Sequence, residues 1–126
     1  QAVEDTMAWA EANDDWQDTG LVNEKFGHYP DVHTINNAAL IVMGLVHGKG
    51  NFEQTIVTTV LGGWDADCTG ATAGSVIGLI LGAKALPEKW VGVFNDQIHS
   101  AVRGYEHCRF SDLAQRTCRF ADANRP

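Results

Sequence analysis

Two carboxylates, Asp65 and Asp67, stand two residues apart in a glycine-bracketed turn. The segment before the turn, residues 52–61, is largely apolar, and the segment after it, residues 71–83, carries no charge and many small residues. Carboxylates at such a junction are costly to desolvate unless a positive charge compensates them. A divalent cation with a preference for oxygen ligands is the simplest compensation, so the pair indicates a metal site.

The same pair permits an alternative without a metal. If Asp67 stands just before a helix that begins near Thr69, its carboxylate meets the partial positive charge of the helix N-terminus. Asp67 is then a plain helix cap, Asp65 is solvated, and the spacing alone does not separate this interpretation from the metal site. An EF-hand is excluded, because the later ligand positions and the closing glutamate are absent.

The elements that would position these carboxylates are predicted to be helices. Apolar positions recur at helical rather than alternating spacing, with Thr34, Asn51 and Ser111 as expected N-caps. The predicted helices span residues 2–13, 16–26, 35–47, 52–61, 71–85, 94–103 and 112–123, with a short turn of helix that begins at Pro87. The predicted architecture is one all-α domain or domain fragment over residues 1–126, built as a helical bundle.

Glycines recur every four residues in the segment that follows the carboxylates. They occupy positions Gly70, Gly74, Gly78 and Gly82, which form one row along a helix. Each glycine costs a helix up to about 1 kcal/mol relative to alanine, so the row favours close approach of another backbone. We therefore expect this helix to lie centrally in the core.

Composition limits the classes of partner. The chain has 126 residues and a net charge of −7, with 44% hydrophobic and 20% charged residues, which is ordinary for a soluble domain. The negative charge argues against nucleic acid and anionic membranes as partners. Three cysteines without a zinc spacing indicate reduced thiols in the cytoplasm. The first residues, QAVEDTMAWA, contain neither a signal peptide nor an initiator methionine context, so we expect the chain to begin midway through a longer protein.

A family resemblance sharpens the metal interpretation. The run from Gly62 to Ala83, GGWDADCTGATAGSVIGLILGA, is similar to the C-terminal metal motif of the ADP-ribosylglycohydrolase family. The resemblance extends over residues 33–117, through Asn37-Ala38-Ala39, the segment 48–52, the segment 86–90 and Asn95-Asp96. It implies the C-terminal part of an all-α fold that holds two Mg²⁺ or Mn²⁺ ions. It also implies hydrolysis of an N- or O-glycosidic bond of ADP-ribose or a related ribosyl substrate, an EC 3.2.2 type of activity.

Carried onto this chain, the resemblance implies that Asp65 and Asp67 are metal ligands and that Asp67 is shared by both ions. Many members have threonine or serine directly after the second aspartate, whereas this chain has Cys68. A neutral thiol is a poor ligand for a hard cation, so Thr69 is the candidate replacement. Some bacterial members carry the same Asp-x-Asp-Cys variant.

The resemblance also predicts what this chain lacks. The first half of the family bears a Thr-Asp-Asp ligand cluster, and nothing here matches it; Asp14-Asp15 is interpreted as a helix cap. Two ions held by two aspartates would have too few ligands. We therefore expect a missing N-terminal half or a second chain to complete the site, and no catalytic residue is assigned in this chain.

Three further residues are candidates for substrate contact. Trp64 adjoins Asp65 and could line the cleft, while His33 and Asn37 lie at the start of a predicted helix. A surface or capping role is favoured for His33, and hydrogen bonding to a buried loop is favoured for one of Asn36 and Asn37. The histidines show no i, i+4 pair or other zinc spacing. The cysteines lack a paired His-Asp arrangement, which disfavours a cysteine nucleophile.

Three hypotheses therefore remain. The first is a metal-dependent hydrolase that acts on a small-molecule or ADP-ribosylated substrate. The second is a helical module that retains the fold without activity, which Cys68 and the missing ligands favour. The third is a purely structural interaction domain. Metal binding by the Asp65 and Asp67 carboxylates separates the first hypothesis from the other two.

Overall fold

The computed structural model describes residues 2–12 and 24–125. The chain divides into two compact units, residues 1–86 and 87–126. The expected helix over 16–26 and the expected cap at Asp14-Asp15 fall largely on 13–23, outside the described residues. The all-α class is confirmed, because helices make up most of the described chain and the strands form one small sheet. The prediction of a single domain stays a prediction, because each unit is described by itself.

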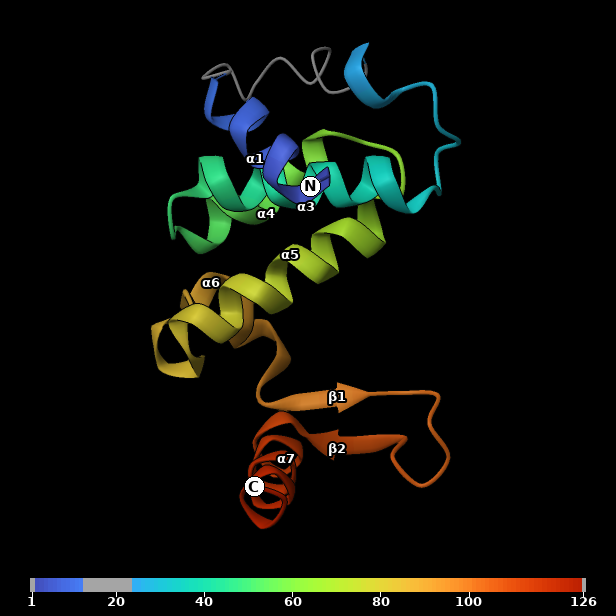
Figure 1. Cartoon of the computed structure of the whole chain (residues 1–126). Helices are drawn as coiled ribbons and strands as arrows, with labels where there is room; N and C mark the ends of the chain where they lie inside the picture. Colours follow the sequence, from blue (N-terminus) through green and yellow to red (C-terminus); the bar gives the residue numbers. More distant parts are fainter. Residues whose placement is uncertain (1, 13–23, 126) are drawn as a thin grey trace. The chain divides into compact units, whose positions relative to one another are not determined.

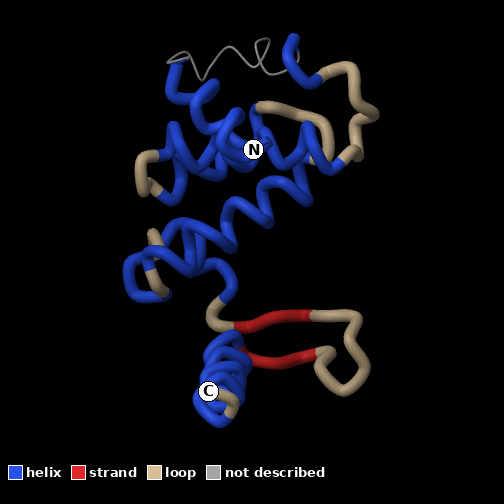
Figure 2. The backbone as a smooth tube through the Cα atoms, viewed as in Figure 1, coloured by secondary structure: helices blue, strands red, loops and turns tan. Residues whose placement is uncertain are grey.

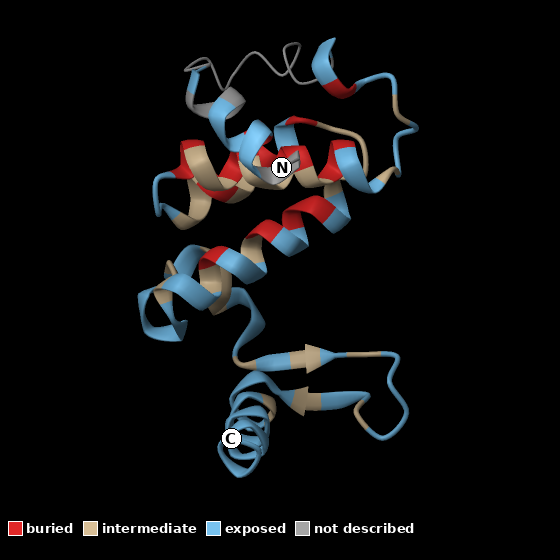
Figure 3. Cartoon of the chain, viewed as in Figure 1, coloured by how far each residue is buried: buried red, intermediate tan, exposed pale blue. Residues whose placement is uncertain are grey.

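In the described part of the first unit, three longer helices pack around a fourth, α3 (Figure 1). They are α1 (Ala2–Ala12), α3 (Thr34–Gly48), α4 (Phe52–Leu61) and α5 (Ala66–Leu81), followed by a short 3-10 helix, η1 (Ala83–Ala85). Helix α3 contacts the other three, and α4 also contacts α5. The buried positions shown in Figure 3 accordingly gather along α3, α4 and α5.

The α3–α4 contact brings two backbones unusually close together. A Cβ added at Gly44 would lie 2.8 Å from the carbonyl oxygen of Thr55, and one added at Gly48 would lie 2.8 Å from the Thr55 Cα. Thr55 and Thr59 are fully buried against these glycines. The small residues that permit close packing therefore lie on α3.

The glycine row of α5 only partly fulfils the expected close approach. A Cβ at Gly70 would lie 2.8 Å from Val60, but one at Gly74 would make an ordinary 3.5 Å contact with Ile56. At Gly78 the nearest atoms are 4.0 Å away, and Gly82 ends the helix with a φ of 75°. The row meets side chains, chiefly of α4, and only Gly70 is tightly approached, so the expected approach of another backbone is wrong.

The second unit consists of short elements and one longer helix. They are α6 (Glu88–Val91), the 3-10 helix η2 (Gly92–Phe94), the strands β1 (Gln97–His99) and β2 (His107–Arg109), and α7 (Phe110–Ala123). The strands pair antiparallel as a hairpin (Figure 2). No described residue of this unit is classed as buried. The expected helix over 94–103 is therefore wrong, because this segment contains η2, left-handed residues at Asn95 and Asp96, and β1.

Two expected helix caps are also wrong. The N-cap of α3 is His33 rather than Thr34, because the His33 Nδ1 accepts a hydrogen bond from the Ile35 N–H. The N-cap of α7 is Arg109, and Ser111 lies inside the helix. The third expected cap is confirmed: Asn51 accepts a hydrogen bond from the Gln54 N–H at the start of α4. None of the described helices is long and apolar enough to cross a membrane.

Candidate metal site

The carboxylates at 65 and 67 are presented by a tight turn between α4 and α5. Gly63 and Trp64 both have left-handed backbones, with φ values of 76° and 51°. Gly62 is buried against Leu40, whose side chain occupies the space that a Cβ would need. Trp64 is half-buried and packs against the core cluster that contains Leu40. The turn is thus anchored to α3 before the chain enters α5.

Helix α5 starts earlier than expected, and this changes where Asp65 and Asp67 lie relative to the helix. The helix begins at Ala66 rather than near Thr69, so Asp65 is the N-cap residue and Asp67 lies in the first turn. The Asp65 side chain makes no capping hydrogen bond. The plain-cap interpretation, with Asp67 before the helix, is therefore wrong, and the Asp65 carboxylate is not committed to the helix backbone.

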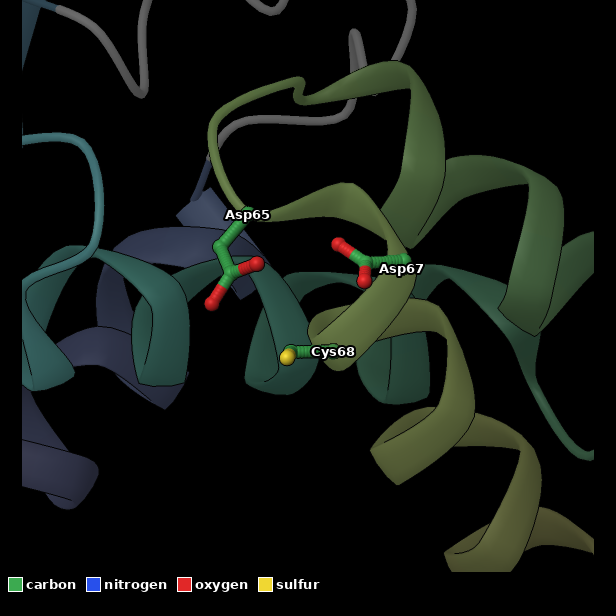
Figure 4. Close-up of side chains that lie close together, drawn as sticks. All are labelled: Asp65, Asp67 and Cys68. Carbon is green, nitrogen blue, oxygen red and sulfur yellow. The ribbon is translucent and has the colours of Figure 1, made fainter. Parts of the chain in front are cut away.

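Asp65, Asp67 and Cys68 converge on one side of this first turn (Figure 4). One potential ligand atom from each of the three lies within 4.8 Å of the other two. Asp65 is half-buried, whereas Asp67 and Cys68 are exposed. Converging carboxylate oxygens suit a hard divalent cation, so the donor set of the two aspartates fits Mg²⁺ or Mn²⁺.

Cys68 does not fit a hard cation equally well. A hydrogen bond with Asp65, and then the negative charges of Asp65 and Asp67, raise the pKa of the Cys68 thiol. The thiol therefore keeps its proton more firmly than an ordinary cysteine does. A protonated thiol is a poor ligand for Mg²⁺ or Mn²⁺, so the useful donors at this turn are oxygens.

Asn37 connects this turn to the loop before α3. Its side-chain nitrogen donates to the carbonyl oxygens of Asp31 at 2.7 Å and His33 at 3.0 Å. Its side-chain oxygen accepts a hydrogen bond from the Asp65 N–H at 3.3 Å. Asn37 thus holds the loop, as the favoured interpretation of the sequence predicts, and it also fixes the backbone of Asp65, which sequence reasoning missed.

Comparison with known proteins decides the family. The family model described as ADP-ribosylglycohydrolase matches residues 1–123. The chain belongs to the ADP-ribosylglycohydrolase family. The match extends beyond the 33–117 span on which the motifs carry the resemblance, and it confirms the all-α glycohydrolase class. No curated protein and no solved structure matches the chain.

Within this glycohydrolase chain, the remaining candidate residues have structural partners of their own. The buried Thr69 hydroxyl donates to the Ala66 carbonyl at 3.4 Å, and its role as a metal ligand stays a prediction. His33 caps α3 and stacks on Tyr29, with ring centroids 4.7 Å apart. The capping role favoured for His33 is confirmed. Substrate contact by His33, Asn37 and Trp64 stays a prediction.

Proposed function

We propose that this ADP-ribosylglycohydrolase chain acts as a metal-dependent hydrolase on a glycosidic bond of ADP-ribose or a related ribosyl substrate. The observation that carries the proposal is the convergence of the Asp65 and Asp67 side chains on one side of the α5 first turn. The family membership supports glycoside hydrolysis, and the two carboxylates support the metal. An N-glycosidic bond, the EC 3.2.2 type, is part of the proposal.

In this function Asp65 and Asp67 hold Mg²⁺ or Mn²⁺, with Thr69 as a candidate further ligand. The metal, when bound, supplies orientation of ribose hydroxyls and a lowered pKa for a water molecule. The protein contributes a turn anchored by Leu40 packing and by the Asn37 hydrogen bond to the Asp65 N–H. In this proposal Trp64, next to Asp65, lines the substrate site.

Two aspartates supply fewer oxygens than two cations require. The remaining ligands in the proposed enzyme come from water, from the substrate, and from protein groups outside this chain. Those groups belong either to an N-terminal half or to a second chain. The proposed setting is the cytoplasm, which the three free cysteines support. The proposed substrate is a small molecule or an ADP-ribosylated group rather than nucleic acid or a membrane.

The direct test is a titration of the chain with Mn²⁺. Binding is measured as the loss of the free-ion signal in electron paramagnetic resonance. We expect saturable binding that Asp67→Asn weakens at least tenfold, because a carboxylate is replaced by a neutral amide. Asp112→Asn is the matched control, since Asp112 is also a first-turn carboxylate but lies on α7. Its Mn²⁺ affinity should match that of the wild type.

A second experiment tests activity in the most complete form of the protein. It measures release of ADP-ribose from an ADP-ribosylated peptide, with and without Mn²⁺. Asp65→Asn and Asp67→Asn should abolish the Mn²⁺-dependent release. Absence of Mn²⁺ binding by the complete protein would instead support the second hypothesis, a helical module without activity. Cys68 stands where many members carry a hydroxyl, and this substitution favours the alternative.

A further inference from the structure

The hairpin of the second unit places two histidines directly opposite each other. The register pairs His99 on β1 with His107 on β2. The Ser100 N–H donates to the Glu106 carbonyl, and the Phe110 N–H donates to the Asp96 carbonyl, each at 3.1 Å. Bonded and non-bonded pairs alternate along an antiparallel ladder. His99 and His107 therefore form a non-hydrogen-bonded pair, the position at which opposing side chains stand closest together.

The separation of these two rings is compatible with two imidazoles on one cation. The ring centroids are 4.7 Å apart, and both side chains are exposed. A zinc–nitrogen bond is about 2.0–2.1 Å long, so each ring centre would lie about 3.2 Å from the cation. At nitrogen–metal–nitrogen angles of about 90–109°, two such ring centres lie about 4.5–5.2 Å apart. The observed separation falls within this range.

We propose that His99 and His107 form a chelating site for a divalent transition-metal cation of the Zn²⁺, Ni²⁺ and Cu²⁺ class. Imidazole suits these cations, whereas Mg²⁺ and Mn²⁺ prefer oxygen ligands. The site lies wholly within the second unit and shares no residue with the Asp65–Asp67 pair. Among the described residues, no group of three metal-binding side chains includes either histidine. Water or a ligand from solution completes the coordination.

The test is a calorimetric titration of the full chain with Ni²⁺ in the presence of excess Mg²⁺. We expect one Ni²⁺ per chain, with His99→Asn and His107→Asn each weakening the affinity at least tenfold. His28→Asn is the matched control, because His28 is an exposed histidine of the first unit beside Tyr29. It should leave the affinity unchanged. Displacement of Ni²⁺ by Mg²⁺, or equal weakening by the control, would overturn the proposal.

A second measurement needs no variant. A cation that bridges the two strands binds only the closed hairpin, so it should suppress opening of that hairpin. We expect Ni²⁺ to slow hydrogen exchange of the Ser100 amide, which donates across the strands. Unchanged Ser100 exchange at saturating Ni²⁺, or wild-type affinity in both histidine variants, would show that the rings are only packed against each other.

Discussion

Asn37 uses both ends of its side-chain amide inside the protein. The nitrogen holds the Asp31 and His33 carbonyls, and the oxygen accepts from the Asp65 N–H. The residue is buried, with only 9% of its surface exposed. It is therefore a positioning residue, which ties the loop before α3 to the carboxylate turn.

Replacing Asn37 by alanine should destabilise the first unit. The change removes three part-buried hydrogen bonds, which join Asn37 to the Asp31 and His33 carbonyls and to the Asp65 N–H. We expect a cost of about 1–3 kcal/mol in the free energy of unfolding. Urea denaturation measures that cost. Asn124→Ala removes an exposed hydrogen bond to the Phe120 carbonyl at the end of α7 and is the control. Equal stabilities of Asn37→Ala and wild type would contradict the positioning role.

At the scale of elements, the contact between α3 and α4 depends on Gly44. Gly44→Ala places a Cβ against the Thr55 carbonyl and the Thr59 side chain. We expect a loss of about 1–3 kcal/mol in the free energy of unfolding, because the two helices must move apart. Thermal and urea unfolding check this value.

Gly74→Ala is the matched variant on α5. Its Cβ would meet only the Ile56 side chain, at 3.5 Å. We expect it to be neutral or to stabilise the protein by up to about 1 kcal/mol, because alanine is the better helix former. A larger loss from Gly74→Ala than from Gly44→Ala would show that the close packing had been assigned to the wrong helix.

The N-terminus of helix α7 is held by Asp96, which lies in the turn just before β1. The Asp96 carboxylate accepts hydrogen bonds from the Ser111 N–H at 2.9 Å, the Ser111 hydroxyl at 2.6 Å and the Arg109 Nε at 2.9 Å. The bonds from Ser111 are the main cause of a lowered pKa for the Asp96 carboxyl, and Arg109 adds to them. Asp96 thus caps a helix that begins fourteen positions later in the chain, at Phe110.

The lowered pKa predicts a pH dependence for the second unit. Because the folded pKa lies below the unfolded value, the stabilisation from Asp96 is present above the unfolded pKa and is lost as the pH falls through the folded pKa. Wild type should therefore be more stable than Asp96→Asn at pH 7, and the difference should disappear in strong acid. Urea titrations at several pH values measure this difference. Asp122→Asn, which removes an exposed pair with Arg125, should show little effect at any pH.

The helices of the first unit could largely be predicted, because long periodic segments carry a strong signal. Phe52–Leu61 matches its predicted bounds despite its β-branched residues, since packing decides where propensity is weak. The hairpin could not be predicted in the same way. Its strands have three residues each, and the spacing of Phe94, Ile98 and Val102 imitates a helical face. The cross-strand histidine pair was missed for the same reason, because its spacing has meaning only in a hairpin.

The candidate metal site was only partly predictable from the sequence. The Asp-x-Asp spacing identifies the two carboxylates, and the small-residue helix that follows is present as expected. The link from Asn37 to Asp65 was not predictable, because it joins residues 28 positions apart through an α3–α5 contact that no local pattern encodes. The start of the helix at Ala66 rather than near Thr69 was also missed, since boundaries depend on the turn geometry of Gly63 and Trp64.

At the scale of the whole molecule, the family match over residues 1–123 spans both units, yet the carboxylate pair belongs to the first alone. Metal binding should therefore stabilise the first unit selectively. A cation that binds only the folded state, present at 100 times its dissociation constant, raises the free energy of unfolding by about 2.7 kcal/mol.

Hydrogen exchange with and without Mn²⁺ checks this prediction. Amides of α3, α4 and α5 should gain protection, and those of α7 should not. Asp67→Asn should remove the gain. Equal protection of both units, or protection that persists in Asp67→Asn, would place the bound Mn²⁺ elsewhere in the chain.

The way in which the carboxylate turn is anchored has a consequence for metal exchange. The main-chain anchors of the turn, which are Leu40 packing at Gly62 and the Asn37 bond to the Asp65 N–H, do not involve the two carboxylates. The partial positive charge at the start of α5 also favours nearby carboxylates when no ion is present. In the proposed enzyme, loading and release of the ion therefore require no rearrangement of these main-chain anchors.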